Sequence, residues 1–145
     1  MQFIKLRFTH RFKRNTDSRI PHHACATETT MNVELFMNIE SLKKVIFERL
    51  DHLNPEKVIL FGSHAWGEPS ADSDIDLYIV TSDATTPATY HERSELYLRY
   101  AKAINAIIGT TPLDLIVHTR PMHQKFLKLD SMFSRKIIQS GISLL

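Results

Sequence analysis

Cysteine is nearly absent from this chain, and long apolar runs are missing altogether. The 145 residues include a single cysteine, Cys25, which excludes an internal disulfide framework and a cysteine-based metal site. No run of about 18 apolar residues is present, and the first residues lack the uninterrupted apolar centre of a signal peptide. We therefore expect a cytoplasmic protein that neither spans a membrane nor is secreted.

Charge is also distributed unevenly. The formal net charge is +2, but residues 1–30 carry +4 and the remainder carries −2. The basic residues of the first segment are Lys5, Arg7, Arg11, Lys13, Arg14 and Arg19. Because no helical or strand period is sustained there, we expect residues 1–37 to be a poorly ordered extension and residues 38–145 to form one globular domain. A basic arm suits weak nucleic-acid binding, but a solvated extension is the simpler interpretation.

The most informative stretch is Val58–Val80, VILFGSHAWGEPSADSDIDLYIV. Its first four residues are apolar and stop at Gly62, which predicts a short buried strand. Glycine adopts backbone angles that other residues avoid, and Ser63 is a favourable N-cap. We therefore expect a turn into a short helix whose first N–H groups bind an anion, with Gly67 keeping bulk away from that anion. Gly-Ser also occurs in plain turns, and no Gly-Lys-Ser/Thr follows, so this is not a P-loop.

Carboxylates follow the turn at alternate positions. Side chains alternate along a strand, so Asp74, Asp76 and Tyr78 are predicted to share one face of a second strand. Like charges roughly 5 Å apart repel by about 3 kcal/mol at an effective dielectric near 20, and a cation relieves this repulsion. Asp114 lies in a third apolar run, residues 112–117, and joins the same face if that strand is a neighbour.

These carboxylates predict a metal site. Mg²⁺ binds a few carboxylates together with substrate phosphates, so Asp74, Asp76 and Asp114 opposite a Gly-Ser anion site predict a two-metal centre for phosphoryl or nucleotidyl transfer. The alternative is structural: Asp72, Asp74 and Asp76 would form a solvated acidic turn, and Asp114 an edge-strand charge. That alternative leaves the polar face of both strands without a purpose.

The whole pattern resembles a known family. Gly62-Ser63, Gly67, Ser73-Asp74-x-Asp76-Leu77 and a later Asp114 resemble the nucleotidyltransferase superfamily that includes DNA polymerase beta and kanamycin nucleotidyltransferase. The likeness covers residues 38–145, which would be the nucleotidyltransferase domain, and is greatest to the small minimal nucleotidyltransferases of bacteria and archaea. Many relatives carry Arg where this chain has Trp66, so a basic contact to the nucleotide is missing there.

The resemblance implies roles for the residues that match. Gly62, Ser63 and Gly67 would bind the triphosphate of ATP or another NTP. Asp74 and Asp76 would hold two Mg²⁺ ions, and Asp114 would complete the shell of the catalytic ion. His118 follows on the same strand face as Asp114 and is a candidate general base. A bound metal ion would also make the acceptor hydroxyl more acidic, and a separate base would then be unnecessary.

The resemblance also implies an activity and a partner. Minimal members are typically paired with a HEPN-type toxin that they neutralise, in some cases by attaching adenylate to it. The implied function is therefore transfer of AMP from ATP to a hydroxyl, with such a toxin as acceptor. Two alternatives remain open: an antitoxin that works by binding alone, and a nucleotidyltransferase for an antibiotic or other small molecule. Because no second domain is present to bind an acceptor, we expect a partner protein or a homo-oligomer to supply that surface.

The fold class is α/β. The chain predicts a helix over residues 38–53, a helix from Thr86-Pro87 to Gly109, and a helical region from Thr119 that is broken near residues 130–131 and ends at Gly141. With the strands, the order is helix, strand, short helix, strand, helix, strand, helix. Alternation alone would predict an all-parallel sheet. The resemblance instead implies the nucleotidyltransferase fold, a small mixed sheet of order 1-2-3 flanked by helices.

Overall fold

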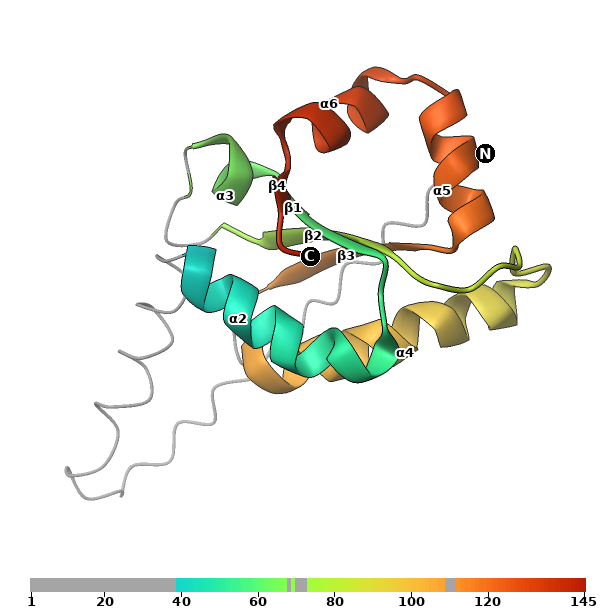
Figure 1. Ribbon diagram of the computed structural model, residues 1–145, viewed down its shortest axis with the longest axis horizontal. Helices are drawn as coiled ribbons and strands as arrows, with labels where there is room; N and C mark the ends of the chain where they lie inside the picture. The colour runs from blue at the N-terminus through green and yellow to red at the C-terminus, as the bar shows by residue number, and fades with distance from the viewer. Residues whose placement is uncertain (1–38, 68, 70–72, 109–111) are drawn as a thin grey trace, which may run out of the picture.

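A small sheet with helices on both faces forms the described part of the protein. The computed structural model describes residues 39–67, 69, 73–108 and 112–145 (Figure 1). The basic extension, Asn38, Asp72 and Gly109 lie outside these residues, so the predictions made for them remain predictions. In Figure 1, helices α2 and α4 lie on one side of the sheet, and α5 and α6 on the other.

The sheet is mixed, as predicted. Its strands are β1 (Lys57–Phe61), β2 (Ile75–Val80), β3 (Leu113–His118) and β4 (Ile142–Ser143), in the order β3-β2-β1-β4. Strand β1 pairs antiparallel with both β2 and β4, whereas β2 and β3 are parallel. The three predicted strands therefore have the predicted neighbours.

Strand β4 was not predicted, and it changes the strand order at one edge. Gly141 makes this pairing possible, because a Cβ at this position would lie 2.5 Å from Ile59 Cγ2 and would also overlap the carbonyl oxygen of Ile137. Two residues after the end of a helix are too short a signal for sequence patterns to identify as a strand.

The helices match the prediction except at their boundaries. They are α2 (Ile39–Leu50), extended by a 3-10 turn (Asp51–Leu53), α3 (Ser63–Trp66), α4 (Tyr90–Ile108), α5 (Arg120–Lys128) and α6 (Met132–Ser140). The predicted break after α5 is confirmed: Asp130 has a φ of 44°, and the Ser131 side chain caps α6 by accepting a hydrogen bond from the Ser134 N–H. None of the helices in these described segments is long and apolar enough to cross a membrane.

Helix α4 starts later than predicted. The Thr86-Pro87 signal was wrong as a helix start, because Thr89 provides a better cap three residues on. Its hydroxyl accepts from the Glu92 N–H at 3.2 Å, and the Glu92 carboxylate accepts from the Ala88 N–H at 2.7 Å. This reciprocal arrangement satisfies donors at the helix start that would otherwise be unpaired.

The two faces of the sheet have separate cores. The face beneath α2 and α4 buries aliphatic side chains, among them Ile46, Leu77 and Ile104. The face beneath α5 and α6 buries a smaller and more aromatic set: Ile59, Phe61, Tyr78, Val80, Phe126 and Ile137. We call these the aliphatic face and the aromatic face.

Candidate functional site

Two of the three predicted metal ligands lie side by side on the aromatic face. In the parallel pairing of β2 with β3, Asp76 is the direct partner of Asp114. Neighbouring strands are about 4.8 Å apart, and directly paired residues share a face. The flanking residues Leu77 and Leu115 both belong to the aliphatic core, which assigns the two aspartates to the opposite face. Asp114 is buried, with 4% of its surface exposed.

The Asp114 carboxylate also affects the pKa of Tyr97 on α4. Burial raises the pKa of Tyr97 above its ordinary value, and the Asp114 carboxylate raises it further, because a nearby negative charge disfavours a phenolate. Strand β3 is the edge of the sheet, so a side chain of α4 at this edge is electrostatically coupled to a carboxylate on the other face.

The predicted anion-binding turn touches one of these carboxylates. Gly62 follows Phe61, whose strand partner is Asp76, and it has a φ of 74°. A Cβ at Gly62 would lie 2.7 Å from Asp76 Cγ and closer still to one carboxylate oxygen. Glycine is therefore required at position 62 for two reasons: the backbone angle disfavours other residues, and the Asp76 carboxylate occupies the space that a Cβ would need. Two motifs that are separate in sequence meet at this point.

The turn itself differs from the prediction in one respect. Gly62, and not Ser63, takes the N-cap position of α3, and no side-chain hydrogen bond caps the helix. The Ala65 and Trp66 N–H groups both donate to the Gly62 carbonyl, at 3.1 and 3.0 Å. The helical bonds thus begin at Ala65.

Gly67 ends the short helix. It has a φ of 105° and its N–H donates to the Ser63 carbonyl at 3.1 Å, so the backbone angle alone favours glycine. A Cβ at this position would meet nothing within 4 Å. The role predicted for Gly67 beside a bound anion stays a prediction.

Asp74 lies just before the strand that carries Asp76. It immediately precedes β2, which begins at Ile75, and it is partly exposed. The loop that carries it is tied to α3, since His64 Nε2 lies 3.3 Å from the Ser73 carbonyl oxygen. Within the segments that the structure describes, no group of three His, Cys, Asp or Glu side chains is arranged to hold a metal ion. The structure thus brings together Asp76 and Asp114 and places Asp74 at the entrance to the strand.

Trp66 packs between the sheet and α6. Its ring centroid lies 6.4 Å from that of Phe61, and the Lys136 ammonium lies 3.9 Å from the indole centroid. The indole N–H is buried and has no hydrogen-bond partner among the described residues. The lysine above the ring was not predicted. The contact joins residues 70 positions apart, so no local pattern signals it.

A second polar group on this face is the histidine cluster, formed by Tyr78, His118 and His123. The Tyr78 hydroxyl lies 3.0 Å from His118 Nδ1 and 2.7 Å from His123 Nδ1. A hydroxyl donates only one proton, so at least one of these histidines carries its proton on Nδ1. The Tyr78 ring also stacks on Phe126 of α5, with centroids 5.2 Å apart.

The histidine cluster is held neutral by burial. Burial, and then the neighbouring His123, lower the pKa of His118 to about 4. Burial likewise lowers the pKa of His123, with Lys57 adding to the effect and Glu56 opposing it, and burial raises the pKa of Tyr78. His118 is therefore an uncharged packing group between the sheet and α5, with one ring nitrogen already engaged by Tyr78.

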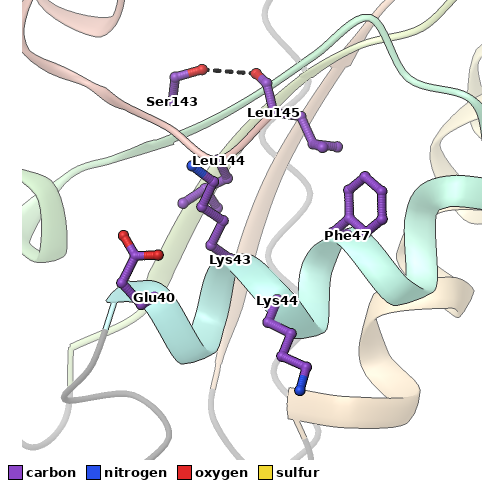
Figure 2. A pocket seen from close by; sticks show the side chains of 7 residues that line it. All are labelled: Glu40, Lys43, Lys44, Phe47, Ser143, Leu144 and Leu145. Carbon is purple, nitrogen blue, oxygen red and sulfur yellow. Dashed lines mark hydrogen bonds between the residues drawn. The ribbon is translucent and has the colours of Figure 1, made fainter.

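A groove on the aliphatic side of the sheet is separate from Asp76 and Asp114. It has a volume of about 510 Å³ and is lined by Glu40, Lys43, Lys44, Phe47, Ser143, Leu144 and Leu145 (Figure 2). Its walls are α2 and the end of the chain, where the Ser143 hydroxyl donates to the Leu145 carbonyl at 2.7 Å. Leu144 belongs to the aliphatic core, so this groove does not open onto Asp76 and Asp114.

Parts of this chain are similar to known proteins. A candidate protein adenylyltransferase of Methanocaldococcus jannaschii, MJ0604, is 40% identical over 58 residues, which are 40% of this chain and 57% of that protein. The match thus spans little more than half the length of this curated relative. A crystal structure of a candidate nucleotidyltransferase from Sulfolobus solfataricus aligns with a TM-score of 0.47 and 21% identity, over 77% of this chain and 84% of that one. Residues 40–145 match the model of the polymerase beta nucleotidyltransferase family, and the chain belongs to that family.

Proposed function

We propose that this protein transfers AMP from ATP to a hydroxyl group of a protein. The observation that carries the proposal is the meeting of the three motifs: Asp76 pairs with Asp114 and lies against Gly62. Carboxylates beside a turn that begins a helix suit a nucleoside triphosphate with its divalent cations. Family membership and the name of the archaeal relative point to the same reaction.

The residues of the chain would divide the work as follows. The N–H groups of Ser63 and His64 would donate to the phosphate oxygens, while Gly62 lets the carboxylate of Asp76 approach the turn. Asp76 and Asp114, joined by Asp74 from the strand entrance, would hold two Mg²⁺ ions. Bound Mg²⁺ would supply charge stabilisation of the phosphates and a more acidic acceptor hydroxyl.

The bonds that change are few. The acceptor oxygen forms a bond to the α-phosphorus of ATP, the bond between that phosphorus and the oxygen bridging to the β-phosphate breaks, and pyrophosphate leaves. The acceptor proton passes to solvent. No oxidant, reductant or further co-substrate is required.

A protein acceptor is favoured by the surface beside the site. Around the junction of α5 and α6 the side chains of Leu127, Leu129, Met132, Phe133 and Ile138 are exposed, with Met132 at 82%. Exposed apolar groups of this kind suit contact with another protein more than with a polar small molecule. A HEPN-type toxin encoded beside this protein is the acceptor that we propose.

Labelled ATP tests the proposal. The purified protein is incubated with Mg²⁺, the product of the neighbouring gene and ATP labelled at the α- or the γ-phosphate. We expect protein-bound label from α-labelled ATP only, together with pyrophosphate release. Label from γ-labelled ATP would indicate a kinase instead. A stable complex without label or pyrophosphate would contradict transfer and favour an antitoxin that acts by binding alone.

A further inference from the structure

A lysine on α6 stands beside the proposed nucleotide site. Lys136 is exposed, and its ammonium lies 3.9 Å from the centroid of the Trp66 ring. Trp66 is one helical turn from Gly62, since its N–H donates to the Gly62 carbonyl. The next residue of α6, Ile137, belongs to the aromatic core, so the lysine approaches from the same side of the sheet as Asp76 and Asp114.

Among the described residues, the partner found for the Lys136 ammonium is an aromatic ring and not a carboxylate. Its neighbour Arg135 forms an ion pair with Asp130 at 3.6 Å, but no carboxylate in the described part of the chain lies within ion-pair distance of Lys136. The face of an indole ring attracts a cation without neutralising it. A free lysine samples many rotamers, and the ring limits that freedom, so the ammonium is held near one position before a ligand binds.

The proposed reaction needs a cation in this neighbourhood. Two divalent ions do not balance three carboxylates and a triphosphate, and nucleotide-binding sites place fixed cations against the phosphate chain for this reason. We infer that Lys136 is a positioning residue that binds the phosphate chain of the nucleotide, with Trp66 as its platform. This inference rests on the proposed function and adds a residue to the same site.

A structural role is the competing explanation. Lys136 could serve only to tie α6 to α3 through the indole ring, in which case its charge would matter for stability and not for nucleotide binding. Lys136→Met separates the two roles, because it keeps the length and apolar stem of the side chain and removes only the charge. Lys136→Arg keeps the charge. Lys44→Met is the matched control, since Lys44 lies on α2 on the other side of the sheet.

Equilibrium dialysis with labelled ATP and Mg²⁺ gives the affinities, and inorganic tripolyphosphate serves as a competitor without a base. Trp66 is the only tryptophan, so its fluorescence reports independently on the lysine and on a ligand that approaches it. We expect Lys136→Met to weaken binding of ATP and of tripolyphosphate by about tenfold or more, with a melting temperature lowered by at most about 5 °C through loss of the contact with the ring. Lys136→Arg should remain within about threefold of the parent protein, and Lys44→Met should match it.

Each other outcome overturns the inference. Parent-like binding of ATP by Lys136→Met would show that the lysine is structural. An equal loss in Lys44→Met would show a general effect of net charge. If the unaltered protein binds neither MgATP nor another MgNTP, the proposed function itself fails, and the role of Lys136 fails with it.

Discussion

The two faces of the sheet are built from different chemistry. On the aliphatic face, leucine, isoleucine and valine from β1, β2 and β3 meet the buried stripes of α2 and α4. On the aromatic face, the same strands present Asp76, Tyr78 and His118 among phenylalanine rings. Alternation along a strand assigns successive residues to opposite faces, so one six-residue strand contributes to both.

The contrast between the two faces indicates that one face mainly stabilises the fold and that the other carries the polar groups of the candidate site. Aliphatic burial stabilises the fold without imposing a specific chemical environment. Carboxylates, histidines and unpaired donors cost stability unless they are neutralised or hydrogen-bonded. Both buried side-chain polar atoms that lack a partner within the described segments, Trp66 Nε1 and Thr119 Oγ1, are outside the aliphatic core. We interpret the aliphatic face as the support that allows the aromatic face to carry a costly site.

The largest expected effects come from Asp76 and Leu77, which are neighbours on β2 but lie on opposite faces of the sheet. Asp76→Asn should lower AMP transfer by roughly a thousandfold, about 4 kcal/mol in the barrier, because a proposed metal ligand is lost. Its melting temperature should equal or exceed that of the parent protein, since the charge beside Asp114 is removed. Leu77→Ala should instead cost about 3–5 kcal/mol of stability while the folded fraction keeps its transfer rate.

Thermal melts and initial rates of label transfer measure both variants. The division between the faces would be wrong if Asp76→Asn unfolded the protein as readily as Leu77→Ala did. It would also be wrong if Asp76→Asn retained transfer. Because the two positions are adjacent on one strand, a difference between them cannot arise from their location along the sheet.

Gly62 tests the close contact between the turn and the carboxylate. Gly62→Ala should cost about 2–6 kcal/mol, from a backbone conformation that only glycine adopts readily, about 1–3 kcal/mol, and from overlap with Asp76, about 1–3 kcal/mol. Gly67→Ala is the control for a left-handed glycine with open space where a Cβ would lie, and it should cost only about 1–2 kcal/mol. Chemical denaturation of both variants measures the two losses, and Gly62→Ala should lose more, because both its backbone conformation and its contact with Asp76 oppose a Cβ. Equal losses would contradict the contact.

Sequence patterns predicted the parts of this molecule that depend on local order. Strand β1, the alternation of β2 and the break at Asp130 each follow from a few consecutive residues, and the structure contains all three. A shared face for Asp76 and Asp114 required only that β2 and β3 be neighbours, so it was predictable from alternation along the strands. Their direct pairing depends on the register of the two strands, which the sequence patterns do not give.

The remaining features depend on contacts between distant segments. Tyr78 meets His123 across 45 residues, and Lys136 meets Trp66 across 70, so neither contact leaves a local signal. Helix α4 shows the same dependence, because Tyr90 is 65% exposed whereas Leu96, Tyr100, Ala101 and Ile104 are buried. The packing of α4 on α2 and on β3 determines which of its apolar residues are buried.

The histidine cluster predicts that the aromatic face weakens in acid. The folded state holds the pKa of His118 at about 4, below its ordinary value of about 6.5. The unfolded chain therefore binds more protons between these pH values, and stability should be full above about pH 6.5 and fall by on the order of 2–3 kcal/mol towards pH 4. Denaturant midpoints at several pH values measure this loss.

Two histidine variants identify the source of that loss. His118→Gln removes one titrating ring and should reduce the loss between pH 6.5 and 4, while His123, whose pKa is also lowered by burial, contributes the remainder. His91→Gln alters an exposed histidine on the outer surface of α4 and should leave the profile unchanged. A flat profile in the unaltered protein would contradict the assignment, and so would an unchanged profile in His118→Gln.

The smallest expected effect concerns the helix caps on the aromatic side. Thr119 precedes α5 and is buried, yet its hydroxyl makes no cap and has no hydrogen-bond partner among the described residues. Thr119→Val removes an unsatisfied polar atom without changing the shape, so it should stabilise the protein by about 0.5–1 kcal/mol. Ser131→Ala is the control, because the Ser131 hydroxyl accepts from the Ser134 N–H at 3.0 Å, and its loss should cost about 1 kcal/mol. Opposite shifts in melting temperature would show that the aromatic side holds polar groups at a cost to stability, whereas a loss in both variants would mean that Thr119 has a stabilising role.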